Sequence, residues 1–255
     1  MRRLNCGPNK ISSLDLSKNP KLNFLACIYN PLGSLDLSNN KELDSLYCEH
    51  VAINTLDISN NLKLKVIECG MNQLTAMDVS KNTLLEVLRC NYNNISSLDL
   101  SKNVLLKGLS CSGNELNELD LSVNSELNGL GCDYNHLTTL DVSQKTKMVA
   151  LNCSYNQLTN IDITNNNLLK WLLCENNQLE SLNVSTNLNL ISLLCNENKL
   201  INLDISKNIR ITALEISGIP TLSKVCVWAT PFPPSSVIVF SSGSPNVFYS
   251  TECSK

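Results

Sequence analysis

The chain of 255 residues lacks the composition of several functional classes. Charged residues make up only 17% and the net charge is −3, so no basic excess indicates nucleic-acid binding. No apolar run approaches the roughly 18 residues of a membrane-spanning helix. We therefore expect neither a nucleic-acid partner nor a membrane span in this chain.

Catalytic motifs are equally scarce. Only two histidines are present, His50 and His136, and neither stands in a Ser-His-Asp or metal-ligand pattern. Asp and Ser are plentiful, but they recur as repeat elements, and no glycine-rich phosphate loop occurs. The sequence therefore predicts no enzymatic activity, no cofactor and no metal site.

The beginning of the chain lacks a signal peptide, because its two early arginines are followed by no apolar stretch. Instead, Leu4 and Cys6 already hold the positions that Leu25 and Cys27 hold one repeat later. We therefore expect that upstream sequence is missing, together with any targeting signal.

Cysteine, in contrast, is abundant, and ten of the twelve cysteines recur every 21 residues. They belong to a unit of the form L-x-x-L-x-C-x-x-N-x-L-x-x-L-D-L-S-x-N-x-x, with ten complete copies that end near Asn208. A fixed period of this length is typical of repeat solenoids. The cysteine ladder comprises Cys6, Cys27, Cys48, Cys69, Cys90, Cys111, Cys132, Cys153, Cys174 and Cys195.

Alternation within the unit predicts short extended segments. In Leu25-Ala26-Cys27 the leucine and the cysteine point to one side, and Leu35-Asp36-Leu37 alternates in the same way. One coil cannot bury its apolar side alone, whereas stacked coils share a continuous core. The sequence predicts a mainly β solenoid with few or no helices. It leaves open the curvature, and whether the Leu-Asp-Leu segment is a strand or an irregular return.

The cysteine ladder is predicted to fill the core. Neighbouring strands lie about 4.8 Å apart, whereas the Cβ atoms of a disulfide lie about 3.8 Å apart. A zinc site needs about four ligands that converge on one point, and a straight file does not converge. Free cysteine packs as a small hydrophobe, so we expect buried, unreactive thiols.

Polar ladders run beside the apolar ones. Two asparagine ladders, at the positions of Asn30 and Asn40, are each Asn in nine of ten units and are expected to bond the backbone at bends. The aspartate ladder, at the position of Asp36, points outward. We expect its carboxylates to accept hydrogen bonds from the adjacent Ser or Thr or from backbone amides, with bound Ca²⁺ as the alternative.

The unit resembles the signature of leucine-rich repeats, with cysteine in place of the usual apolar residue. Its length and its L-D-L-S-x-N segment are similar to those of bacterial secreted proteins, both internalin-like proteins and surface proteins of Bacteroides type. The resemblance covers residues 4 to about 216. It implies a right-handed superhelix of parallel β-strands, with a concave binding face lined by the L-x-C strands.

On that face the outward positions differ from coil to coil, as expected where a surface is free to vary or is tuned to a partner. Apolar side chains gather on consecutive coils at Trp171, Leu173 and Leu194. Tyr47 and Arg89 stand at the same variable position in earlier coils. We predict that these five residues contact a partner protein. For Trp171 the alternative is that it covers the edge of the core.

A tyrosine stripe precedes the asparagine of the turn in four coils, at Tyr29, Tyr92, Tyr134 and Tyr155. Tyr134 and Tyr155 lie on adjacent coils, where their rings can stack. This predicts either a site for sugar rings or peptide, or simple shielding of the turn.

The composition changes at Pro220. We therefore expect two parts, a solenoid over residues 1–219 and a capping segment over residues 220–255. Within the segment, 237–240 and 247–249 are predicted strands with a turn between them. The sequence predicts that they form a β-hairpin that covers the open end of the core.

Cys226 and Cys253 lie outside the ladder and are predicted to form a disulfide. The loop of 27 residues between them would give a stabilisation of about 3 kcal/mol. Such a bond requires an oxidising compartment, so we expect an extracellular or cell-surface protein.

These observations favour a non-catalytic module that binds another protein through its variable face. A glycan-binding surface protein that uses the tyrosine stripe is the second hypothesis. A structural spacer of a larger surface protein is the third.

Overall fold

The structure is a computed structural model that describes residues 1–253. The chain divides into two compact units, Met1–Leu127 and the residues from Asn128 onward. Every strand in the described residues is three residues long, and no helix occurs among them. The predicted fold class, a mainly β repeat solenoid, is confirmed.

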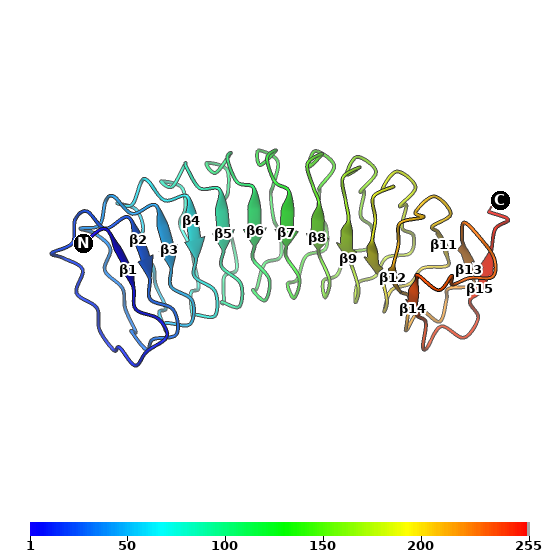
Figure 1. The fold of residues 1–255 in the computed structure, drawn as a ribbon, viewed down its shortest axis with the longest axis horizontal. Coiled ribbons are helices and arrows are strands. Elements are labelled where there is room, and N and C mark those ends of the chain that lie inside the picture. Colours follow the sequence, from blue (N-terminus) through cyan, green and yellow to red (C-terminus); the bar gives the residue numbers. More distant parts are fainter. Residues whose placement is uncertain (254–255) are drawn as a thin grey trace. The chain divides into compact units, whose positions relative to one another are not determined.

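The first unit holds one parallel sheet with its strands in chain order (Figure 1). Leu4 pairs with Leu25 and Leu25 with Leu46, so the register repeats with the period of the sequence. Each strand is one L-x-C segment. The strands are β1 (Arg3–Asn5), β2 (Phe24–Ala26), β3 (Ser45–Tyr47), β4 (Val66–Glu68), β5 (Val87–Arg89) and β6 (Gly108–Ser110).

The second unit contains two parallel sheets (Figure 1). The first of them, which we call the strand sheet, comprises, in order, β7 (Gly129–Gly131), β8 (Ala150–Asn152), β9 (Trp171–Leu173), β10 (Ser192–Leu194), β12 (Ala213–Glu215) and β14 (Ile238–Phe240). The second, which we call the return sheet, comprises β11 (Asn202–Asp204), β13 (Lys224–Cys226) and β15 (Phe248–Ser250). The Leu-Asp-Leu segment therefore becomes a three-residue strand only from Asn202 onward among the described residues.

The predicted C-terminal hairpin is wrong, although both of its strands exist. β14 pairs in parallel with β12, and β15 pairs in parallel with β13 in the other sheet. Ile238 and Phe248 are about half a coil apart, so the turn between them carries the chain from one sheet to the other. Each strand then meets the unpaired edge of an existing parallel sheet, which satisfies its backbone groups.

The core of each unit consists of stacked leucine and cysteine side chains. Leu25 and Cys27 are fully buried, and the same positions are buried in the following coils. The nine ladder cysteines from Cys27 to Cys195 have no exposed surface, which agrees with the predicted core filling. In a stack of this kind, the leucine and cysteine side chains of one coil pack directly on those of the next, so no larger side chains are needed to fill the core.

The first asparagine ladder closes the turn after each L-x-C strand. Asn93 Nδ2 donates to the carbonyl oxygens of Cys69 and Cys90, at 3.2 and 2.9 Å. Its Oδ1 accepts the backbone amide of Leu74 at 3.0 Å. One buried amide group thus satisfies backbone groups of its own coil and of the preceding coil, as expected from the sequence.

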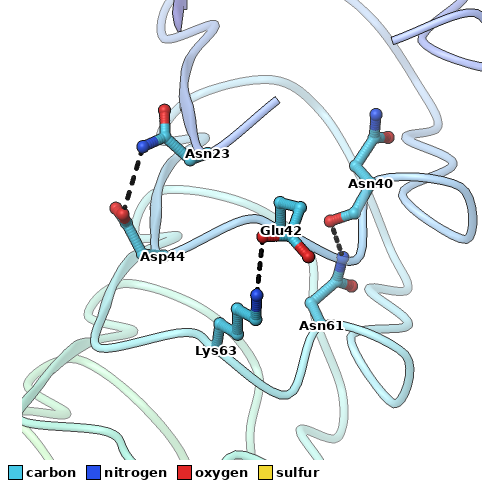
Figure 2. A network of polar contacts seen from close by, with 6 residues as sticks. All are labelled: Asn23, Asn40, Glu42, Asp44, Asn61 and Lys63. Carbon is cyan, nitrogen blue, oxygen red and sulfur yellow. Dashed lines mark hydrogen bonds and ion pairs between the residues drawn. The ribbon is translucent and has the colours of Figure 1, made fainter. Parts of the chain in front are cut away.

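The second asparagine ladder joins neighbouring coils at the other bend. Asn61 Nδ2 donates to the backbone oxygen of Leu37 at 3.1 Å. It also donates to the backbone oxygen of Asn40 at 2.9 Å, as Figure 2 shows. Asn61 has no exposed surface. Because the donated bonds run to the preceding coil, this ladder connects the stack through buried polar contacts.

Surface side chains also link neighbouring coils of the first unit. Lys63 Nζ lies 2.6 Å from Glu42 Oε2, and Asn23 Nδ2 donates to Asp44 Oδ2 at 3.4 Å (Figure 2). Both side chains of the ion pair are more than half exposed, so the pair adds little stability.

Candidate interaction surface

The strand face, formed by the outward side chains of β1–β6 in one unit and of β7–β10, β12 and β14 in the other, carries the variable residues. In β9 the central Leu172 is fully buried, Trp171 is exposed and Leu173 is half-buried. The other strands of this face also have a central residue that points inward, although in β2 the outer Ala26 is buried as well. The outer positions of the other strands are therefore available for contacts.

In the first unit an aromatic pair begins this face. The rings of Phe24 and Tyr47 lie 5.4 Å apart on the adjacent strands β2 and β3. The Arg3 guanidinium lies 3.9 Å from the centre of the Phe24 ring. Tyr47, a predicted contact residue, is half-buried by these neighbours. Its ring therefore already has intramolecular partners.

Arg89, the second predicted contact residue of this unit, forms an ion pair with Glu68 on the adjacent strand. Burial raises the pKa of the nearby Glu49 carboxyl, Glu68 raises it further, and Arg89 lowers it. The arginine thus neutralises a local group of carboxylates. Its own side chain stays 53% exposed, so it remains accessible.

The predicted apolar cluster of the second unit lies on two adjacent strands. Leu173 pairs in register with Leu194, and Trp171 with Ser192. Trp171 is 43% exposed, and the Lys170 ammonium lies 5.9 Å from its ring centre. The structure therefore places Trp171, Leu173 and Leu194 on neighbouring positions of two adjacent strands, with the indole partly exposed.

Two further apolar residues lie on the same strand face, one strand beyond Ala213 and Glu215 of β12, and were missed by the sequence analysis. Ile238 and Phe240 of β14 are 61% and 55% exposed. They pair in register with Ala213 and Glu215 of β12, so they continue the two outer rows of the strand face. The hairpin prediction concealed them, because it assigned 237–240 to a cap. We name Trp171, Leu173, Leu194, Ile238 and Phe240 the apolar surface.

The tyrosine stripe occupies a backbone position of unusual conformation. Tyr29, Tyr92, Tyr134 and Tyr155 all have φ between 51° and 54°, the left-handed region. The rings of Tyr134 and Tyr155 stack with centres 4.1 Å apart and planes 10° apart. Tyr29 instead meets His50 edge to face at 5.0 Å. The predicted stacking of Tyr134 on Tyr155 is confirmed.

The aspartate ladder is held by hydrogen bonds along the chain. In each coil with the aspartate, its Oδ1 accepts the backbone amide two residues on; Asp36 accepts that of Ser38 at 2.9 Å, and Asn183 accepts that of Ser185 in the one coil that has asparagine instead. Hydrogen bonds from the Ser38 amide and hydroxyl lower the pKa of Asp36. The predicted bonding of the ladder to Ser and to the backbone is therefore confirmed, and it accounts for the repeated aspartate.

The ladder thiols are kept protonated by burial. Desolvation raises the pKa of Cys90 and of Cys195 to about 12. Because the thiolate is the reactive form, such groups are poor nucleophiles and metal ligands near neutral pH.

The last two cysteines differ from the ladder. Cys226 is buried and Cys253 is half-buried, and both are thiols in this structure. Their sulfur atoms and a carboxylate oxygen of Asp204 all lie within 4.8 Å of one another. This is the one such group of at least three metal-ligating side chains among residues 1–253. The sulfurs are close, and the disulfide between them stays a prediction.

No family model matches the chain, and no curated protein sequence does. Solved structures match it well. The functional domain of InlJ from Listeria monocytogenes, which includes a cysteine ladder, is 34% identical with a TM-score of 0.85. The match covers 89% of this chain and 53% of that chain, so this chain spans about half the length of the InlJ structure.

Two further structures share the fold. The internalin InlF from Listeria monocytogenes is 17% identical over all of this chain and 88% of its own, with a TM-score of 0.70. The plant peptide hormone receptor RGFR1, solved in complex with RGF2, is 22% identical over 90% of this chain and 39% of its own, with a TM-score of 0.67. The resemblance to internalin-type leucine-rich-repeat proteins is confirmed. Among the described residues, no helix has the length and apolarity to cross a membrane.

Proposed function

We propose that this chain is a non-catalytic module that binds a partner protein through the apolar surface of its second unit. The observation that carries the proposal is the exposure of Trp171, Ile238 and Phe240 on one strand face. Tryptophan and other large aromatic side chains dominate the energetics of protein interfaces. Exposed apolar side chains that gather on one face of a protein are also typical of interaction sites.

The structural neighbours support a protein-binding role. The plant peptide hormone receptor RGFR1 was solved in complex with RGF2, and it shares the solenoid fold with this chain. Fold likeness alone does not identify a partner, because one scaffold serves many partners. The side chains of the strand face therefore carry the specificity in this proposal.

The experiment compares surface variants in cross-linking and pull-down assays with extracts of the native organism. Trp171→Ala and Phe240→Ala are expected to remove the captured partners. Leu188→Ala is the matched control, because Leu188 of the same unit is 52% exposed but lies in a turn outside the strand face. If both strand-face variants still capture the same proteins as the unchanged chain, the proposal is contradicted and the spacer hypothesis is favoured.

Glycan binding is a second candidate, favoured by one observation. Tyr134 and Tyr155 form a stacked pair that is 48% and 38% exposed, and aromatic faces bind sugar rings. A glycan array should then show binding that Tyr134→Ala removes. Tyr92→Ala, at the same position of another coil and 49% exposed, is the control.

We also propose that the protein is exported to the cell surface or medium. The internalin-type neighbours support this location, and a disulfide between Cys226 and Cys253 would form there. Protein isolated from the native organism should weigh two hydrogen atoms less than the fully reduced chain. A mass equal to that of the reduced chain, with both thiols open to alkylation, would contradict the disulfide.

A further inference from the structure

The cluster of Asp204, Cys226 and Cys253 arises from a substitution in the aspartate ladder. Residues 203–205 read Leu-Asp-Ile, and 225–227 read Val-Cys-Val. Asp204 and Cys226 are direct partners in the register of β11 and β13. Cys226 therefore occupies the outward position of a ladder aspartate, and its thiol does not belong to the file of core cysteines.

Adjacent partners of a parallel sheet project their side chains to the same side, about 4.8 Å apart. Leu203 and Val225 beside them are buried, which fixes the outward direction of Asp204 and Cys226. Cys226 is nevertheless only 6% exposed. The end of the chain approaches this place, because Lys224 Nζ donates to the backbone oxygen of Glu252 at 2.5 Å.

The third ligand comes from that terminal segment. Cys253 Sγ lies 3.7 Å from the backbone oxygen of Ser250, the last residue of β15. The three side chains line a cavity of about 150 Å³ together with Asn202, Leu203 and Lys224. Asp204 Oδ1 accepts the amide of Ser206, as in the other coils, and the second carboxylate oxygen is available as a ligand.

We propose that Asp204, Cys226 and Cys253 bind one Zn²⁺ ion in the reduced protein. Zinc takes thiolate sulfur at about 2.3 Å and carboxylate oxygen at about 2.0–2.2 Å, so ligand atoms around it are separated by less than about 4 Å. Atoms that already lie within 4.8 Å of one another need only a small convergence. Water would fill the fourth tetrahedral position.

The chemistry of the donors favours this ion. Two thiolates select soft or borderline metals, and the carboxylate disfavours Cu⁺, while Ca²⁺ and Mg²⁺ require mainly oxygen ligands. Two thiolates and one carboxylate around Zn²⁺ leave one negative charge, and the ammonium of Lys224 lines the same cavity. The site was not foreseen from the sequence, because the pair was assigned to a disulfide alone.

The metal site and the predicted disulfide use the same sulfur atoms and exclude each other. A disulfide oxidant such as oxidised glutathione would take two electrons from the two thiols, form the bond between Cys226 and Cys253, and leave as two thiols. Zinc would then lose both sulfur ligands and dissociate. The site therefore binds metal only while the pair is reduced.

The test uses the full chain, fully reduced without oxygen and stripped of metal, and titrates it with Co²⁺ and then with Zn²⁺. We expect one equivalent of Co²⁺ to give a sulfur-to-cobalt charge-transfer band and visible bands of tetrahedral intensity, and Zn²⁺ to displace it. Cys226→Ser and Cys253→Ser should each remove the charge-transfer band or weaken Co²⁺ binding by at least tenfold.

Asp204→Asn keeps the turn, because Asn183 accepts the amide of Ser185 at the same position of the preceding coil. It should weaken binding, whereas Asp162→Asn in another coil should not. Absence of the sulfur-to-cobalt band, or a band that persists in both serine variants, would overturn the proposal. So would an unchanged affinity in Asp204→Asn.

Discussion

The two sides of each coil differ in how constant their side chains are from one coil to the next. The return side, which is the side of the Leu-Asp-Leu segment, has the same Asp-to-amide bond in almost every coil, as in Asp36 with Ser38 and Asp99 with Ser101. The strand face changes at each step, from an ion pair at Arg89 to an exposed indole at Trp171. The comparison teaches that the interior and the return side hold the coil, which leaves the strand face free to vary.

The largest expected loss of stability follows from a substitution in the interior of the coil, on which both sides depend. Asn93→Leu removes four hydrogen bonds and leaves the buried Leu74 amide without its partner, whereas the two cysteine carbonyl oxygens each keep a second asparagine donor. We expect a loss of about 2–4 kcal/mol in the free energy of unfolding, since the buried unsatisfied amide costs about 1–3 kcal/mol and each further lost hydrogen bond contributes about 0.5–1.5 kcal/mol.

Urea unfolding followed by circular dichroism would measure this loss. The adjacent Asn94→Ala is the control, because Asn94 is exposed and should change stability by less than about 0.5 kcal/mol. Equal effects of the two substitutions would contradict the role of the first asparagine ladder.

A smaller effect is expected at the cysteine ladder. Cys90→Ala leaves a small cavity in the core, so the free energy of unfolding should fall by about 1–2 kcal/mol. In the native protein, a thiol reagent should label Cys6 and reduced Cys253 rapidly, because these two are half-buried, and the fully buried Cys90 only slowly. Rapid labelling of Cys90 at low denaturant would disprove core filling.

The return side should make stability depend on acid. Hydrogen bonds from Ser101 lower the pKa of Asp99, and Asp36 and Asp57 behave alike. A carboxylate with a lowered pKa in the folded state stabilises the fold above its unfolded pKa, and loses this contribution as the pH falls through the folded pKa. The urea concentration at the midpoint of unfolding should therefore decrease as the pH is lowered below about 4.

Asp99→Asn should reduce this acid dependence, because asparagine keeps an acceptor for the amide and does not titrate. A urea midpoint that does not change between neutral and acidic pH would contradict this prediction. It would show that the hydrogen bonds to the aspartates stabilise the fold equally when the carboxyl groups are protonated.

The strand face should give the smallest effect on stability. Arg89→Ala removes an ion pair whose arginine is half in solvent, so the free energy of unfolding should change by less than about 1 kcal/mol. Thermal unfolding of the two proteins side by side would measure this change. A loss as large as that of Asn93→Leu would show that the variable face also supports the coil.

Much of the fold was predictable from the sequence, because each coil repeats the same local chemistry. The alternation in Leu25-Ala26-Cys27 predicted the strand and the buried cysteine, and the asparagines predicted the bends. The stacked Tyr134 and Tyr155 followed from their spacing of one period. Repeated positions in a solenoid become neighbours in space, so sequence spacing translates directly into contact.

The end of the chain was less predictable. Residues 237–240 and 248–250 show the strand pattern of a hairpin, yet each strand pairs with a different sheet. The local pattern specifies an extended segment but not its partner, because backbone pairing depends on which sheet edge is open. The positions of the exposed Ile238 and Phe240, two of the five residues of the apolar surface, depended on that choice.

The sequence by itself determined the period, the inward rows of leucine and cysteine, and the ladders of asparagine and aspartate, because these are properties of each unit and its nearest neighbour. Only the tertiary structure decided which unlike residues meet. It placed Phe240 in the row of Leu173 and Leu194, and Asp204 beside Cys226 and Cys253. Cys226, Phe240 and Cys253 lie after residue 219, where the 21-residue period is lost, so the period does not predict their neighbours.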